Sequence, residues 1–131
     1  MEALLPLHIA LMSIAIMLVI AAALIAKGRK KNWLKTHKKF ALAGVVISIL
    51  GAACIASQKI AHHYHHFRTP HALAGLVTLC FLLITPLIGA SIAKKPHLLR
   101  PIHRAFGRIT SGILLLTGCM GVYQFIQLNK E

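Results

Sequence analysis

"LLPLHIALMSIAIMLVIAAALIA", residues 4–26, is a long apolar stretch without a single Lys, Arg, Asp or Glu. In an α-helix, about 20 residues at 1.5 Å rise each cross a hydrocarbon core of roughly 30 Å. The stretch differs from a signal peptide because no basic residue precedes it and it ends in a basic cluster without a small-residue cleavage pattern. It therefore predicts a helix that stays in the membrane.

Three further stretches of similar length and character follow this one, at Phe40–Ile60, Ala72–Ala93 and Phe106–Leu128. The chain of 131 residues is 57% hydrophobic and has a mean hydropathy of +0.73, which is too apolar for an ordinary soluble domain. The expected fold is all-α, an integral membrane four-helix up-down bundle. We expect a single transmembrane domain over residues 1–131, with helices at about 4–26, 38–60, 71–93 and 104–128.

The net charge of +13 is concentrated in two links between the apolar stretches. Lys27–Lys39 holds seven Lys or Arg residues and Lys94–Arg108 holds five, which together are 12 of the 15 in the chain. Both links lie on the same side of a four-helix topology, so the positive-inside rule predicts that they face the cytoplasm and that both termini lie outside. The expected location is the cytoplasmic (inner) membrane, with membrane lipid rather than nucleic acid as the partner of the basic residues.

Acidic residues are confined to the two ends of the sequence, at Glu2 and Glu131. This excludes paired-carboxylate catalysis and carboxylate-rich metal cages. Any chemistry must use histidine, basic or hydroxyl side chains, or a cofactor.

One histidine lies at or near the beginning of each predicted helix, His37 and His103 directly before theirs: His8, His37, His71 and His103. Successive helices run in opposite directions, so these side chains form two levels. His8 and His71 belong to the outer level, and His37 and His103 to the cytoplasmic level. In an up-down bundle, the first and third helices can face each other, and so can the second and fourth.

Small residues share a helix face with each of these histidines, because positions i+4, i+7, i+11, i+14, i+15 and i+18 lie on the same face as position i. After His71 the face holds Gly75, Thr78, Leu82, Thr85, Pro86 and Gly89; after His103 it holds Gly107, Thr110, Leu114, Thr117, Gly118 and Gly121. After His8 it holds Met12, Ala15, Val19, Ala22 and Ala26, and after His37 it holds Gly44 and Gly51. Such faces allow close packing of helices in lipid. They also leave room for a flat macrocycle, and a glycine four residues after a ligand, as at Gly75 and Gly107, clears that room.

Two imidazoles from facing helices are good axial ligands for a haem iron. A single histidine at a helix end is more often only an interfacial side chain. One histidine per helix, paired by level, is harder to explain in that way. The pattern therefore predicts two haem sites, one near each membrane surface, that form a path for electrons.

Four short motifs in order resemble the four-helix core of the eukaryotic-type cytochrome b561 family: "HIALM" (8–12), "KTHKKFALAG" (35–44), "HALAG" (71–75) and "HRAFG" (103–107). The family consists of transmembrane di-haem electron carriers and usually has six helices, whereas four are expected here. The resemblance implies two haem b groups, the outer one ligated by His8 and His71 and the cytoplasmic one by His37 and His103.

The same resemblance implies a site for ascorbate on the cytoplasmic face, with Lys31 and Lys35 among its basic residues and a similar part for Arg100 and Arg104. The expected activity is electron transfer between a quinol or an ascorbate-like reductant and a redox partner, such as a periplasmic multihaem cytochrome or another redox subunit. Whether the chain is itself an oxidoreductase stays open.

The segment "HHYHHFR" (62–68) adds four histidines: His62, His63, His65 and His66. They are compatible with metal binding or proton transfer, and equally with a polar outer loop, because a His-rich tract is only a compositional hint. A metal-handling or transport protein that uses this loop is therefore the alternative function. Against it, a cation path requires ionisable or amide groups in mid-membrane, and no predicted helix carries an Asp, Glu, Asn or His there. A cofactor-free accessory subunit is the third possibility.

Overall fold

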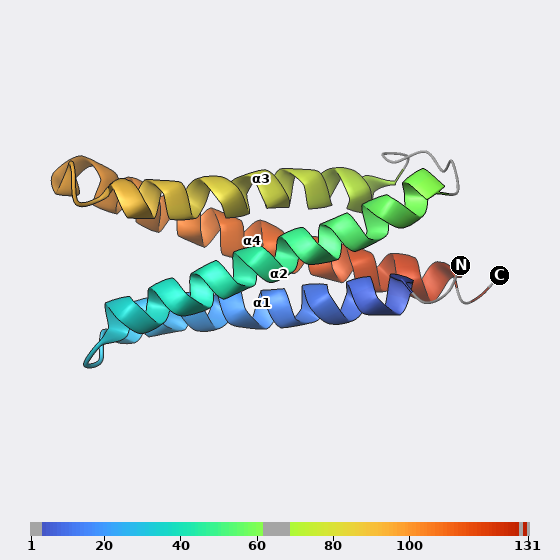
Figure 1. Ribbon diagram of the computed structural model, residues 1–131, viewed down its shortest axis with the longest axis horizontal. Coiled ribbons are helices and arrows are strands. Elements are labelled where there is room, and N and C mark those ends of the chain that lie inside the picture. Colours follow the sequence, from blue (N-terminus) through green and yellow to red (C-terminus); the bar gives the residue numbers. More distant parts are fainter. Residues whose placement is uncertain (1–3, 62–68, 129, 131) are drawn as a thin grey trace.

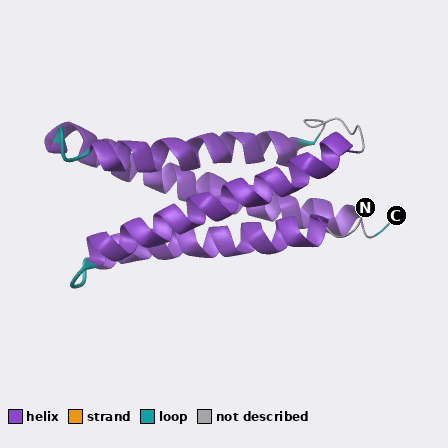
Figure 2. Ribbon diagram, in the orientation of Figure 1, coloured by secondary structure: helices purple, strands orange, loops and turns teal. Residues whose placement is uncertain are grey.

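The computed structural model describes residues 4–61, 69–128 and 130. These residues form four long α-helices and no strand (Figures 1 and 2). The helices are α1 (Leu4–Gly28), α2 (Trp33–Ala61), α3 (Pro70–Ser91) and α4 (Pro96–Leu128). The predicted all-α four-helix bundle is confirmed.

Two short links turn the chain at the same end of the molecule, on the left in Figure 1. The link at residues 29–32 is tight because Arg29 and Asn32 take left-handed φ angles of 46° and 63°. The link at 92–95 joins α3 to α4. Short links make consecutive helices antiparallel neighbours. We call this end the basic end, and the end with both chain termini the terminal end.

Helix packing follows the order of the chain. α1 packs along α2 and α3 along α4, and the two pairs meet through contacts of α1 with α4 and of α2 with α3. Among the described residues, no Cα atoms of α1 and α3, or of α2 and α4, come within 8 Å of each other. The helices of each of these two pairs therefore face each other diagonally across the interior, as an up-down bundle requires.

The helix ends differ from the predicted ones. The second helix begins at Trp33 instead of 38 and the fourth at Pro96 instead of 104, while the first ends at 28 instead of 26 and the third spans 70–91 instead of 71–93. Hydropathy marks the part of a helix that lies in hydrocarbon, whereas basic turns outside it are also helical. His37 and His103 consequently lie within their helices and not at their beginnings. α3 begins at Pro70, a residue that suits the first position of a helix, and the Thr69 hydroxyl caps it by accepting from the backbone N–H of Ala72 at 3.3 Å.

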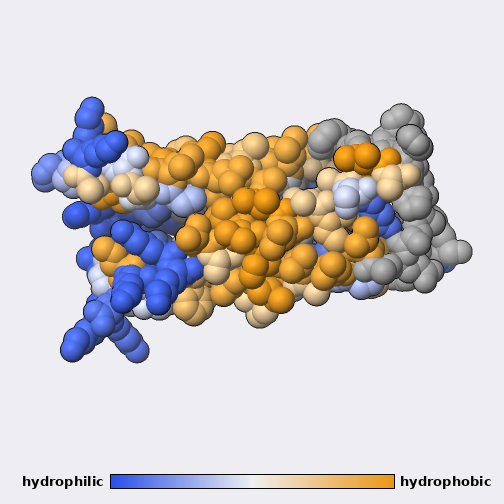
Figure 3. Space-filling view, in the orientation of Figure 1, coloured by the Kyte–Doolittle hydropathy of each residue, from blue (hydrophilic) through white to orange (hydrophobic). Residues whose placement is uncertain are grey.

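All four helices are long and apolar enough to span a membrane. Figure 3 shows an apolar band around the middle of the molecule and hydrophilic side chains gathered at the basic end. Large apolar side chains such as Met17, Leu42, Leu87 and Leu116 are at least 60% exposed, which suits contact with lipid rather than water. The chain is a multi-pass membrane protein.

The buried residues recur at positions i+7, i+11 and i+14 counted from each helix's histidine. They are Ala15, Ala22, Gly44, Ser48, Gly51, Thr78, Leu82, Thr110, Leu114 and Thr117, with Val45 beside them. The small-residue faces predicted from the sequence thus form the interior. Because lipid offers no hydrophobic driving force between helices, close contact of small residues is the main way in which such helices can attract one another.

Candidate functional site

His37 on α2 and His103 on α4 meet across the interior at the basic end. Their ring centroids are 6.1 Å apart and the ring planes cross at 84°. At the terminal end, His8 on α1 and His71 on α3 hold the corresponding positions on the other diagonal pair of helices. The structure therefore brings the four histidines together in the two levels that the sequence predicted.

Each of the four imidazoles donates its Nδ1–H to a backbone carbonyl of the helix packed beside it. The N–O distances are 2.8 Å from His8 to Gly51, 2.9 Å from His37 to Ala22, 3.1 Å from His71 to Thr117 and 3.0 Å from His103 to Thr85. A carbonyl can only accept, so the proton of a neutral ring must be on Nδ1. Nε2 then keeps its lone pair, which is the state that a metal ligand needs.

The four acceptors obey a single rule, because each stands at position i+14 counted from the histidine of its own helix. Gly51 stands in this relation to His37, Ala22 to His8, Thr117 to His103 and Thr85 to His71. Each histidine is therefore level with the i+14 position of its neighbouring helix. The two histidine levels are consequently about 21 Å apart along the bundle, at 1.5 Å per residue.

In the α3–α4 pair, the imidazole of each helix lies against a glycine of the other helix. A Cβ at Gly121 would lie 2.9 Å from Cε1 of His71, and a Cβ at Gly89 would lie 2.9 Å from Cε1 of His103. Both distances are too short for a real Cβ, so only glycine allows these ring positions. The sequence analysis placed both glycines on the shared faces but did not assign them this contact.

The glycines expected to make room for a macrocycle behave differently. A Cβ at Gly75 or at Gly107 would meet no atom within 4 Å. Space is therefore open one helical turn beyond His71 and His103. That this space serves a macrocycle stays a prediction.

The helices α3 and α4 carry the same residues at the same spacing, His-x3-Gly-x2-Thr-x3-Leu-x2-Thr-x3-Gly, beginning at His71 and at His103. Because the helices are antiparallel, the repeats pair end to end. The hydroxyls of Thr78 and Thr117 are 2.8 Å apart, as are those of Thr85 and Thr110. The shared helix faces predicted from the sequence contain all these residues, but a pairing between the two repeats was not predicted. The full repeat was the signal from which the Thr pairs and the glycine contacts could have been found.

The separation of the His37 and His103 rings fits an iron ion held between the two imidazoles. Imidazole nitrogens bind first-row metals at about 2.0–2.1 Å, and the ring centroid lies about 1.1 Å behind the nitrogen, so two coaxial ligands have centroids about 6.2 Å apart. His37 and His103, at 6.1 Å, match this separation. Their fixed Nδ1 protons and the space beside Gly107 fit a bis-histidine haem as well.

Lys31 is the one of the four basic residues expected to bind a reductant that lines a cavity. The cavity has a volume of about 390 Å³ at the basic end. It is lined by Leu24, Ile25, Gly28, Lys30, Lys31, Trp33 and Thr36. Lys35, Arg100 and Arg104 are exposed at the same end of the molecule but outside this lining. Trp33 connects the cavity to the histidine pair, since its ring centroid is 6.3 Å from that of His37.

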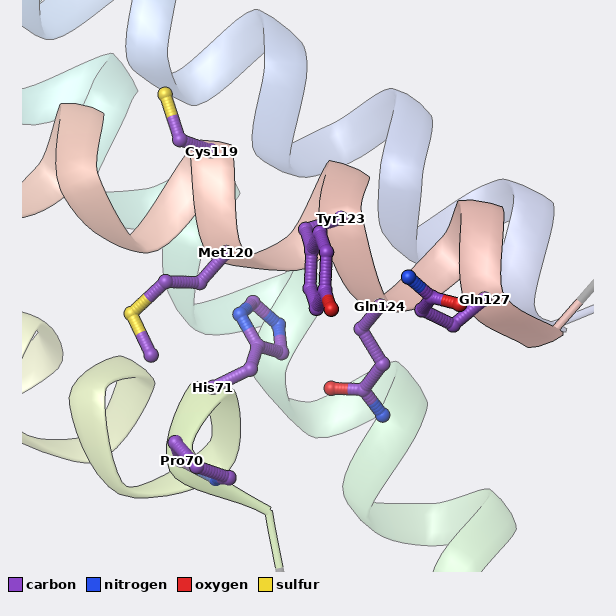
Figure 4. A pocket seen from close by; sticks show the side chains of 7 residues that line it. All are labelled: Pro70, His71, Cys119, Met120, Tyr123, Gln124 and Gln127. Carbon is purple, nitrogen blue, oxygen red and sulfur yellow. The ribbon is translucent and has the colours of Figure 1, made fainter.

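A second cavity, of about 510 Å³, lies between α3 and α4 at the terminal end (Figure 4). We call it the terminal groove. It is lined by Pro70, His71, Cys119, Met120, Tyr123, Gln124 and Gln127.

The four clustered histidines His62, His63, His65 and His66 lie outside the described residues. Among the residues that the structure does describe, no group of three or more His, Cys, Asp or Glu side chains is placed to hold a metal ion. The metal-handling alternative therefore gains no support from this part of the chain.

The family model for eukaryotic cytochrome b561 matches residues 7–128. The comparisons with curated proteins and with solved structures gave no match. The family match covers nearly the whole chain and includes all four paired histidines and both histidine levels. The chain therefore belongs to the eukaryotic cytochrome b561 family and is a transmembrane b-type cytochrome of electron transfer.

Proposed function

We propose that this protein carries electrons between the two ends of the bundle through two b haems, one held by His8 and His71 and the other by His37 and His103. The observation that carries the proposal is the set of four Nδ1–H hydrogen bonds, which leaves Nε2 free on every member of both pairs. Bound haem would supply one-electron chemistry at iron.

The protein's own residues have three tasks in this function. Backbone carbonyls of the neighbouring helices orient the ligands. The packed residues between the levels, such as Ala15, Ser48 and Leu114, are at most 1% exposed and exclude water from the space between them. The lipid-facing side chains hold the bundle across the bilayer, so that the two levels lie near opposite surfaces.

The charge distribution supports an orientation and two kinds of partner. The basic end faces the cytoplasm by the positive-inside rule, and both termini then lie outside. Lys31, with Lys35, Arg100 and Arg104 around it, suits an anionic, ascorbate-like reductant at that end, whereas a quinol would enter from the lipid. A redox protein such as a periplasmic multihaem cytochrome would dock at the terminal end.

The test is the haem content of the purified protein, measured by the pyridine haemochrome assay together with a reduced-minus-oxidised spectrum. We expect two b haems per chain in the unmodified protein and one in His8→Ala, His71→Ala, His37→Ala or His103→Ala. His97→Ala is the matched control, because His97 is exposed on α4 near its beginning. Protein made with ample haem that contains none would refute the proposal, as would an equal loss in the control.

A further inference from the structure

The terminal groove is lined mainly by apolar surface, and the Gln and Tyr side chains of α4 lie towards its outer part. Gln127 and Gln124 line its outer part near the end of α4, whereas Met120 and Cys119 line the part nearer the middle of the membrane. From Gln127 to Cys119 the groove descends about 12 Å into the bundle, at the rise of an α-helix. Its lining therefore suits a molecule with a polar head and an apolar body.

Three polar side chains of α4, namely Tyr123, Gln124 and Gln127, lie at the outer part of the groove. Figure 4 shows the imidazole of His71, from α3, projecting towards Tyr123 and Gln124 of α4, with Gln127 one turn further on. Tyr123 is 66% exposed and so reachable from the lipid. A phenol can donate and accept one hydrogen bond, and an amide can do both at separate atoms. The set suits a ring with hydroxyl or carbonyl groups.

The internal repeat shows that this polar set is not needed to hold a histidine. Tyr123, Gln124 and Gln127 stand at positions i+20, i+21 and i+24 counted from His103, and the equivalent positions counted from His71 hold Ser91, Ile92 and Lys95. The imidazoles at the two ends are nevertheless held alike, His71 by Thr117 and Gly121, and His103 by Thr85 and Gly89. The polar set at the terminal end is therefore not among the contacts that the two imidazoles share.

We propose that the terminal groove binds the head of a lipid-soluble hydroquinone, with Tyr123 and Gln124 hydrogen-bonded to its ring oxygens and its tail along Met120 and Cys119. The proposal rests on the proposed function, because electrons from the ring enter at the level of His71. Oxidation of one hydroquinone to the quinone releases two electrons and two protons. Haem bound at the two histidine levels would take up these electrons one at each level, and both protons would leave to the water at the terminal end.

Binding can be tested without haem chemistry, because two exposed cysteines are natural probes. Cys119 lines the groove, whereas Cys80 lies on α3 outside its lining. Protein in nanodiscs is treated with N-ethylmaleimide with and without decylubiquinone, and labelling of each cysteine is followed by mass spectrometry. We expect decylubiquinone to slow labelling of Cys119 several-fold and to leave Cys80 unchanged. Equal labelling of Cys119 with and without the quinone would overturn the proposal.

The redox role is tested by stopped-flow reduction of the haem-loaded protein with decylubiquinol. Each lost hydrogen bond should weaken binding about 3- to 10-fold, so Tyr123→Phe and Gln124→Leu should each raise the half-saturating concentration by that factor. Ser91→Ala, at the repeat position that corresponds to Tyr123, is the matched control and should change nothing. Unchanged half-saturation in both variants would contradict the proposal.

The two proposals fail in different ways. Dithionite-reducible haem is measured on every sample. If the haem is complete and the groove variants behave like the unmodified protein, the groove proposal alone is wrong. If the unmodified protein holds no haem, the proposed function is wrong, and Cys119 labelling still decides whether the groove binds the quinone.

Discussion

At the scale of single residues, the ligand geometry depends on backbone atoms. Every imidazole of the two pairs is oriented by a carbonyl of a neighbouring helix, at 2.8 to 3.1 Å. A side-chain substitution at Gly51, Ala22, Thr117 or Thr85 cannot remove this acceptor. The residues that can disturb the rings are those whose side chains would occupy the same space.

Gly121→Ala should displace the ring of His71, because the new Cβ would lie 2.9 Å from Cε1. Overpacking of this kind costs roughly 1–3 kcal/mol, so we expect lower haem occupancy at the terminal end and a shifted midpoint potential for any haem that remains. Gly89→Ala should act in the same way on His103. Gly112→Ala, which would meet no atom within 4 Å, is the control. Haem content and potentials equal to those of the control would contradict this account.

Gly75→Ala and Gly107→Ala should separate cofactor binding from helix packing. Nothing lies within 4 Å of either added Cβ, so the haem-free protein should be unchanged or stabilised by up to about 1 kcal/mol, as alanine is the better helix former. Haem content should nevertheless fall, because the methyl group takes space beside the ligand. The two quantities are measured by thermal unfolding of the haem-free protein and by the haemochrome assay. Full haem occupancy in both variants would show that this space serves no macrocycle.

At the scale of helices, the α3–α4 pair is joined by two threonine contacts that the repeat places symmetrically. The Thr78 hydroxyl donates to the carbonyl of Ala74 at 2.7 Å, which leaves its oxygen to accept from Thr117 at 2.8 Å. Both side chains are buried. The pair is therefore a satisfied polar contact inside an apolar environment.

Thr117→Val should destabilise the bundle by about 0.5–1.5 kcal/mol, the usual net value of one hydrogen bond. Thr78→Val combined with Thr117→Val should cost little more than the single change, because the hydrogen bond between the two hydroxyls is already lost and only the bond of Thr78 to the Ala74 carbonyl is removed in addition. Unfolding in increasing sodium dodecyl sulfate, followed by circular dichroism, measures both. Ser91→Ala, close to the surface at the basic end, gives the baseline. A double variant that is much less stable than Thr117→Val would show that the hydroxyls act independently.

The interior faces of the helices could be predicted from the sequence. The ends of the helices, and the shift of each helix along its neighbour, could not. The spacings i+7 and i+11 from a histidine placed Thr78 and Leu114 correctly, because one helix's periodicity decides which residues share a face. The start of α2 at Trp33 was missed since its first turns are basic and hydropathy stops at the hydrocarbon. The acceptor carbonyl of Thr117 was missed because it depends on how far α4 is shifted along α3. No pattern within one helix contains that shift.

At the scale of the whole molecule, the charge is divided between the two ends. Lys27 to Lys39 and Lys94 to Arg108 place 12 basic residues around one end of the bundle, as the hydrophilic region of Figure 3 shows. Moving such a cluster across a membrane with a negative interior is unfavourable, because each charge would have to pass through the hydrocarbon core. The charge therefore predicts which histidine pair faces which compartment.

Fusions to reporter enzymes should confirm this orientation. Alkaline phosphatase joined after Lys130 should be active and green fluorescent protein at the same point dark, because the former works only outside the cytoplasm and the latter only inside. Fusions after Lys95, in the α3–α4 link, should give the opposite pair of signals and serve as the matched control. Since the two histidine levels are about 21 Å apart along the bundle, the result also assigns the His37–His103 pair to the inner surface and the terminal groove to the outer one. An active phosphatase at Lys95 with an inactive one at Lys130 would reverse the assignment, and the protons released in the terminal groove would then enter the cytoplasm.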